Sequence, residues 1–219
     1  MMKQAIGALA LIGTMATANA GVLLQEDFNQ VATLSASGWV LNNLSPIPGE
    51  IADWYQGVPS TLTAHAGLPS QYIAASYLNA TPVDANTPSA INNWLITPTF
   101  SVEKSGTITF WANAEAFPGY SDQLAFGLSD GSSTPGAFSL NPVFTVPTGG
   151  WTRYVLNFAG MGKGAVARFG IQYSGDTSTS NFVGVDSLLI TAVPEPGTMM
   201  MFGAGLVGLM AARRRRTRG

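Results

Sequence analysis

The sequence predicts an all-β protein, a jelly-roll β-sandwich flanked by an N-terminal signal helix and a C-terminal transmembrane helix. Three observations predict the sandwich. The apolar runs between residues 21 and 192 are short, several alternate with period two, and clusters of Gly, Pro, Ser and Asp separate them. Between the two ends, no long stretch has the 3.6-residue period of an amphipathic helix. Sheets with one buried face follow from this pattern.

The first 20 residues have the features of a secretory signal peptide. Lys3 supplies a short positive region, and residues 5–16 form an apolar run without a polar face. Ala18 and Ala20 flank Asn19 in the small-x-small pattern of a cleavage site. The alternative is a buried N-terminal helix. The signal-peptide interpretation predicts that the mature chain starts at the next residue.

The strands of the body follow as short apolar runs. In the sixth run, Ile108, Phe110 and Ala112 share one face, as a half-buried strand requires. The expected strands are Val22–Phe28, Trp39–Asn42, Ile51–Tyr55, Gln71–Tyr77, Trp94–Thr97, Thr107–Ala114, Gln123–Ser129, Val143–Val146, Thr152–Phe158, Ala167–Tyr173 and Val183–Thr191.

The body, residues 21–192, has the length of one domain with a single core. It carries four basic residues against eleven acidic ones, a net charge of −7. Such a surface argues against nucleic acid as a partner, because phosphate binding needs clustered Lys and Arg. The sequence has no cysteine, which excludes disulfides, thiolate metal sites and a Cys nucleophile.

The C-terminal segment, residues 193–219, has three parts in fixed order. They are a P-E-P triplet, an apolar stretch over residues 198–212 and an Arg-rich tail over residues 213–219. The apolar stretch would span roughly 22 Å as a helix, so it crosses a membrane only with help from its flanks. Arginines are expected to stay cytoplasmic, which leaves the body outside. An ordinary permanent anchor is the alternative.

This tail closely resembles the PEP-CTERM sorting signal of Gram-negative bacteria. The resemblance implies recognition by an exosortase in the inner membrane, cleavage near the triplet, and transfer from a membrane-anchored intermediate to the cell surface or extracellular matrix. The residues that carry the resemblance are Pro194, Glu195, Pro196, Arg213, Arg214, Arg215 and Arg216.

The body, in turn, resembles the choice-of-anchor J domain, a relative of cleaved-adhesin and MAM-like jelly rolls. The most specific segments are WLITP, residues 94–98, and the closing VDSLL, residues 185–189. The resemblance covers nearly all of residues 21–192. It implies a binding or structural surface module without a common catalytic site.

Catalytic residues are not apparent in this sequence. The single histidine, His65, lies in a loop bounded by Gly and Pro, and no G-x-S-x-G elbow supplies a nucleophile for it. We therefore predict a protein that is not an enzyme. A secreted hydrolase with two catalytic carboxylates is a less favoured alternative. Its acids would come from Glu26, Asp27, Glu50, Asp53, Glu115 and Asp122.

Calcium is the one cofactor that the sequence suggests. In jelly rolls of this type the first and last strands are neighbours. Glu26 and Asp27 lie on the first, and Asp186 lies within the apolar last strand. A buried carboxylate needs a partner, and Ca²⁺ prefers oxygen ligands. We predict a structural Ca²⁺ site from these three residues, with Asn29 as a further candidate. The alternative is that backbone N–H groups satisfy Asp186.

Exposed aromatic residues are candidates for ligand binding. Trp54 and Tyr55 lie in a loop-like context, as does the segment 117–120, which contains Tyr120. Flat aromatic faces stack on sugar rings, although most aromatics in a sandwich fill its core. We therefore expect a noncatalytic adhesive or structural binding module, with exopolysaccharide as a candidate partner. A carbohydrate-binding module is the alternative.

Overall fold

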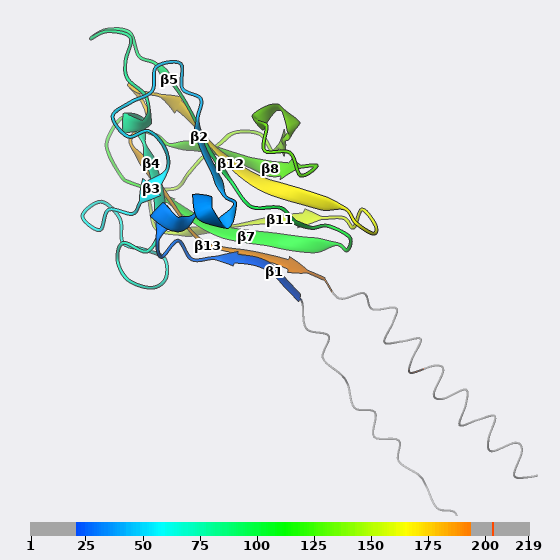
Figure 1. Cartoon of the computed structure of the whole chain (residues 1–219). Coiled ribbons are helices and arrows are strands. Elements are labelled where there is room, and N and C mark those ends of the chain that lie inside the picture. Colours follow the sequence, from blue (N-terminus) through cyan, green and yellow to red (C-terminus); the bar gives the residue numbers. More distant parts are fainter. Residues whose placement is uncertain (1–20, 194–202, 204–219) are drawn as a thin grey trace, which may run out of the picture.

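The computed structural model in Figure 1 describes residues 21–193 and Gly203. Across these residues, no helix combines the length and hydropathy that a membrane crossing requires. The predicted signal peptide 1–20, the triplet 194–196, the Arg-rich tail and, apart from Gly203, the apolar stretch 198–212 lie outside the described residues.

Strands make up most of the regular structure of the body, with short 3-10 helices in its connections. The strands are β1 (Gly21–Glu26), β2 (Val40–Asn43), β3 (Tyr55–Gln56), β4 (Ile73–Ser76), β5 (Ala90–Ile96), β6 (Phe100–Ser101), β7 (Gly106–Ala114), β8 (Gln123–Ser129), β9 (Ser139–Leu140), β10 (Phe144–Thr145), β11 (Thr152–Phe158), β12 (Val166–Asp176) and β13 (Phe182–Ala192). The 3-10 helices are η1 (Val31–Thr33), η2 (Ser35–Ser37), η3 (Tyr77–Asn79) and η4 (Pro135–Ala137).

The strands form two antiparallel sheets, which pack face to face as a sandwich (Figure 1). The six-stranded sheet has the order β11-β7-β13-β4-β3, and β1 also pairs with β13. The seven-stranded sheet has the order β10-β8-β12-β5-β2, with β6 on β12 and β9 on β8. The predicted all-β sandwich is therefore confirmed.

The core lies between the sheets and follows the period of the strands. Ile108, Phe110 and Ala112 of β7 are fully buried, as their alternation predicts. Phe169 and Ile171 of β12 face them from the other sheet, and the Phe110 and Phe169 ring centroids lie 5.7 Å apart. Each Ile or Phe side chain among them contributes about 1.5–3 kcal/mol when it is removed from water.

Both chain ends of the body leave the sandwich at the same end. Gly21 of β1 pairs with Ala192 of β13, at the lower end of both strands in Figure 1. The other end of β13, at Phe182, pairs with Ser76 of β4. Loops that join strands near Phe182 therefore lie at the end remote from both termini. We call this remote end the tip.

A second, smaller cluster covers the outer face of the six-stranded sheet. Tyr72, Ala74 and Phe182 are buried there beneath the connection over residues 57–71. The Tyr72 hydroxyl accepts a hydrogen bond from the Val58 N–H and donates one to the Val58 carbonyl, both at 2.9 Å. Burial raises the pKa of Tyr72 to about 12, so the hydroxyl keeps its proton at neutral pH. The connection is thus fastened to the sheet.

Candidate functional site

Three segments meet at the tip of the sandwich. The central segment is the β12–β13 turn, residues 177–181, and the other two contact it. The Tyr77 N–H of η3 donates to the Asn181 carbonyl at 3.0 Å, and the Ser121 N–H of the β7–β8 loop donates to the Thr179 carbonyl at 2.8 Å. From the other side, the Asn181 amide donates to the Glu115 carboxylate at 2.8 Å. The start of η3, the β7–β8 loop and the β12–β13 turn therefore form one continuous surface.

Aromatic side chains project from this surface into solvent. The exposed fraction is 41% for Tyr77, 55% for Phe117 and 40% for Tyr120. Phe117 and Tyr120 form an edge-to-face pair with centroids 5.2 Å apart. Exposed apolar clusters on a soluble domain mark contact sites. Tyr77, Phe117 and Tyr120 are the site that we carry forward, together with the polar side chains of Glu115 and Asn181.

A buried carboxylate supports the tip from below. Asp122 accepts hydrogen bonds from the Tyr173 hydroxyl at 2.6 Å and from the N–H groups of Asn181 and Phe182 at 2.9 and 3.2 Å. Burial still raises the pKa of Asp122, because loss of solvent outweighs these bonds. Asp122 thus fixes the β12–β13 turn and with it the aromatic loop that follows Glu115.

The predicted ligand residues Trp54 and Tyr55 are placed differently from Tyr120. Trp54 was expected to be exposed and is not: only 3% of its surface is accessible, and its ring packs edge-on against Tyr173. Tyr55 is half-buried and packs edge-on against Phe182, and this burial raises the pKa of its hydroxyl. Trp54 belongs to the main hydrophobic core together with Val31 of η1. Aromatic surface is more stable there than in solvent, so the loop-like sequence did not predict its exposure correctly.

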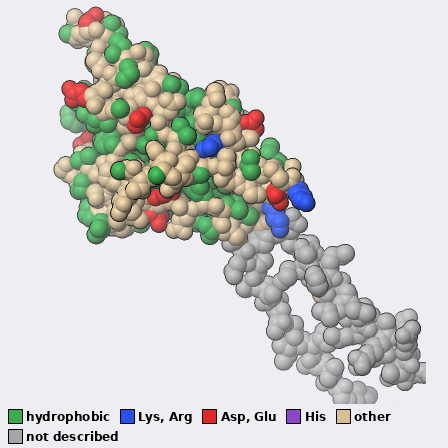
Figure 2. All heavy atoms as spheres, in the orientation of Figure 1, with side chains coloured by type: hydrophobic (Ala, Val, Ile, Leu, Met, Phe, Trp, Pro, Cys, Tyr) green, Lys and Arg blue, Asp and Glu red, His purple; other side chains and the backbone are tan. Residues whose placement is uncertain are grey.

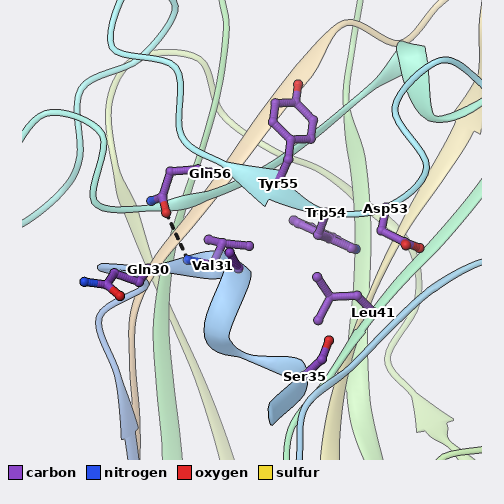
Figure 3. Close-up of a pocket in the computed structure, with 9 residues that line it drawn as sticks. Gln30, Val31, Ser35, Leu41, Asp53, Trp54, Tyr55 and Gln56 are labelled. Carbon is purple, nitrogen blue, oxygen red and sulfur yellow. Dashed lines mark hydrogen bonds between the residues drawn. The ribbon is translucent and has the colours of Figure 1, made fainter. Parts of the chain in front are cut away.

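A hollow of about 570 Å³ lies beside Trp54 (Figure 3). Gln56 closes one side, because its Oε1 accepts a hydrogen bond from the Val31 N–H at 2.9 Å. The Trp54 indole nitrogen is buried without a hydrogen-bond partner. The ring therefore belongs to the side of the hollow and does not offer a face to a ligand. The hollow is lined by Gln30, Val31, Ala32, Ser35, Leu41, Asp53, Trp54, Tyr55 and Gln56.

The predicted calcium ligands lie on neighbouring strands without forming a cluster. β1 does pair with β13, and Glu26 lies opposite Leu188. Within the described part of the chain, however, no three His, Cys, Asp or Glu side chains gather closely enough to hold a metal ion. Asp27 receives a hydrogen bond from the Gln25 amide, and the Glu26 carboxylate caps the Phe28 N–H. Calcium binding stays a prediction.

Asp186 is satisfied by the protein itself. Its carboxylate accepts hydrogen bonds from the N–H groups of Ala66 at 3.1 Å and Ser187 at 2.5 Å, the alternative that the sequence left open. Asp186 is fully buried, and burial raises its pKa. The carboxylate therefore fastens the connection over residues 57–71 to β13.

His65 lies closer to a serine and an aspartate than the sequence suggests. Its Nδ1 is 3.2 Å from Ser187 Oγ, which in turn is 3.3 Å from the Asp186 carboxylate. The imidazole also stacks on Trp111 with centroids 3.9 Å apart. Here the serine stands between the other two groups, whereas in a catalytic triad the histidine does. This arrangement holds the connection over residues 57–71 on the sheet. It does not provide a histidine that an aspartate orients toward the serine.

Comparison with known proteins identifies the tail and the fold. Residues 192–216 match the PEP-CTERM protein-sorting motif. This motif marks an exported protein that is sorted at a membrane to the cell surface. No curated protein matches the sequence.

The body is similar in structure to cleaved adhesin domains of Lys-gingipain from Porphyromonas gingivalis. The K1 domain matches with a TM-score of 0.59 and 15% identity, over 80% of this chain and 100% of that chain. The K3 domain matches with a TM-score of 0.57 and 17% identity, over the same shares. At these identities the similarity shows a shared fold, which agrees with the adhesin-like jelly roll that the sequence predicts.

Proposed function

We propose that this chain is a noncatalytic binding module, displayed at the cell surface, whose tip adheres to polysaccharide of the extracellular matrix. The observation that carries the proposal is that two features lie at opposite ends of the sandwich. The sorting motif begins at one end of β13, and the exposed aromatic residues lie at the other end. A module held at one end offers the opposite end to the surroundings.

The chemistry of the tip suits a sugar chain. Phe117 and Tyr120 present aromatic surface, which stacks on the apolar face of a sugar ring as it does on other flat groups. Glu115 and Asn181 supply a carboxylate and an amide beside them, both groups that bind hydroxyls. Open surfaces of this kind bind extended polymers through several weak contacts.

Export would precede this role. In the proposal, cleavage after Ala20 releases Gly21 as the first residue, and an exosortase in the inner membrane of a Gram-negative bacterium recognises the tail. Cleavage near Pro194 then frees the body for the surface or matrix. β1 begins at Gly21 and β13 ends at Ala192, so neither cut would remove a residue from a strand interior.

Affinity electrophoresis of the full chain tests the proposal, in detergent gels that contain xylan, galactan, dextran or alginate. We expect at least one polymer to retard the protein, and Phe117→Ala with Tyr120→Ala to reduce the association constant about tenfold, as the loss of two stacking contacts predicts. Met161→Ala with Val166→Ala is the matched control, because both residues are exposed hydrophobics at the opposite end. Equal retardation of both variants, or no retardation by any polymer, would contradict a polysaccharide-binding tip.

A further inference from the structure

We infer that the end of the sandwich opposite the tip is a membrane-contact face, on which Lys104, Met161 and Lys163 rest against anionic lipid while the sorting motif is held in the membrane. This inference rests on the membrane-held intermediate of the proposed function. It concerns a different surface from the tip.

Hydrogen bonds join three segments into this face. The Val193 N–H donates to the Ser105 carbonyl at 2.8 Å, which ties the exit of the chain to the β6–β7 turn. The Met161 N–H donates to the Val102 carbonyl at 2.8 Å, which ties the β11–β12 loop to the same turn. The three contact residues therefore surround the point where the sorting motif begins.

The side chains of this face are those of an interfacial segment. Met161 is 75% exposed, the highest fraction among the exposed large hydrophobics of residues 21–193. Lys104 and Lys163 are also exposed. An apolar side chain between cations enters the headgroup region while the ammonium groups meet lipid phosphates.

The body as a whole is acidic, but its basic residues gather at this end, so an anionic membrane surface repels this end less than the others. Three of the four basic residues of the body lie here, since Arg168 of β12 pairs with Ser129 near the same end. In Figure 2, basic side chains lie at the lower right of the described body with an acidic side chain between them, and most other acidic side chains lie over the rest of the visible face. Two acids, Glu103 and Asp130, lie at the same end. The Glu103 carboxylate accepts a hydrogen bond from the Gly164 N–H at 2.8 Å, and the Asp130 carboxylate accepts one from the Ser132 N–H at 3.2 Å.

The length of the connecting chain enforces proximity. Four residues, 194–197, separate Val193 from the start of the apolar sequence at Thr198. Even fully extended, the chain from Val193 to Thr198 spans at most roughly 17 Å. The face therefore stays close to the membrane surface for as long as the apolar stretch is inserted. In this geometry each lysine near an anionic leaflet contributes favourably.

Site-specific labelling tests the contact, and the absence of native cysteine makes each label unique. Met161→Cys and, as the matched control, Phe117→Cys are labelled with a fluorophore in the full chain. Each is reconstituted into vesicles of equal parts phosphatidylcholine and phosphatidylglycerol that carry a headgroup quencher. We expect quenching at position 161 to exceed that at position 117 at least about fivefold. Pure phosphatidylcholine, or Lys104→Gln with Lys163→Gln, should reduce this excess at least about twofold.

Two outcomes would overturn the inference. They are equal quenching at the two positions, and an excess at position 161 that neither lipid charge nor the lysine substitutions change. Flotation of the vesicles shows that each variant is inserted. Retardation by polysaccharide, measured on the lysine variants, is expected to be unchanged. A failure of the tip proposal therefore leaves this measurement interpretable.

Discussion

At the scale of single residues, two buried carboxyl groups and one half-buried carboxyl group influence how stability responds to pH. Burial raises the pKa of Glu26, Asp122 and Asp186 in the folded state. The native state then binds protons more tightly than the unfolded state, so these groups increase the free energy of unfolding as the pH falls. The increase is complete below the ordinary pKa values, 4.5 for Glu26 and 3.8 for the two aspartates. That contribution is lost as the pH rises through the raised values. Asp84 and Asp176 have lowered pKa values and oppose this trend from exposed or nearly exposed positions.

We therefore predict that the free energy of unfolding of the folded body increases as the pH is lowered from neutral through the raised pKa values of these groups. Asp122→Asn should flatten this increase and destabilise the fold by about 1–3 kcal/mol, because an amide cannot accept all three hydrogen bonds. Urea unfolding at several pH values measures both effects. Glu50→Gln is the control, since Glu50 is exposed. A stability that falls on acidification over this range would contradict the prediction.

Calcium binding is testable at the same scale. If Glu26, Asp27 and Asp186 contribute ligands, Ca²⁺ binds the native state preferentially and raises the unfolding temperature, and a chelator reverses the rise. Calorimetric melting with calcium and then with chelator measures this. Asp186→Asn should abolish the effect. An unchanged unfolding temperature would contradict calcium binding. The role of Asp186 would then be to accept the hydrogen bond from the Ala66 N–H.

Aromatic residues show why exposure is hard to predict from sequence. Tyr120 lies in a Gly-Pro loop and is exposed, as predicted, whereas Trp54 lies in a similar context and is buried. The difference arises from η1 and η2, which pack near Trp54 although they are distant in sequence. Tyr77 was not singled out as a ligand residue, because it is the last residue of a predicted strand. Its N–H donates to the Asn181 carbonyl, and this contact with the β12–β13 turn places it at the tip.

At the scale of elements, the last strand changes partner halfway along. One edge of β13 pairs with β4 as far as Val185 and with β1 from Leu188 onward. Between them lies a bulge, and Ser187 adopts φ 51°, a left-handed conformation that is uncommon for a residue with a side chain. The hydrogen bonds of Asp186 and His65 hold this conformation.

Substitution of Ser187 tests the strain. We predict that Ser187→Val destabilises the fold by about 2 kcal/mol, because a β-branched residue disfavours positive φ. Ser187→Gly should differ from the natural protein by less than about 1 kcal/mol, because relief of strain offsets the lost hydroxyl contacts. The midpoint of denaturant unfolding measures each change. Equal destabilisation by both variants would show that the hydroxyl, not the backbone, matters.

Strand prediction succeeded where runs were long and alternating. β8 and β11 have the predicted bounds, β7 starts one residue earlier than predicted, and β13 is one residue longer than predicted at each end. β3 overlaps its predicted run only at Tyr55, β10 is a two-residue strand inside a longer predicted run, and β6 and β9 were not predicted. Such short strands owe their pairing to neighbours in the sheet, so local periodicity carries little information about them.

At the scale of the whole molecule, processing is the open prediction. We expect mass spectrometry of the surface form to give an N-terminus at Gly21 and a C-terminus near Pro194. The calculated mass then lacks the five arginines of the last seven residues. Deletion of the exosortase gene is the control and should leave the tail in place. A surface form that retains Arg213–Arg218 would instead identify a permanent anchor.

The pairing of β7 with β13 has a mechanical consequence. A load applied at the tip enters the end of β7 at Ala114, and the sorting end of the chain leaves from the opposite end of β13 at Ala192. The two strands are antiparallel neighbours, so traction pulls them past one another along their axes. Their ladder of hydrogen bonds, from Val183 opposite Ala114 to Ala192 opposite Gly106, is then sheared as a unit instead of being unzipped bond by bond. A tether with this geometry resists detachment by flow better than its modest size suggests.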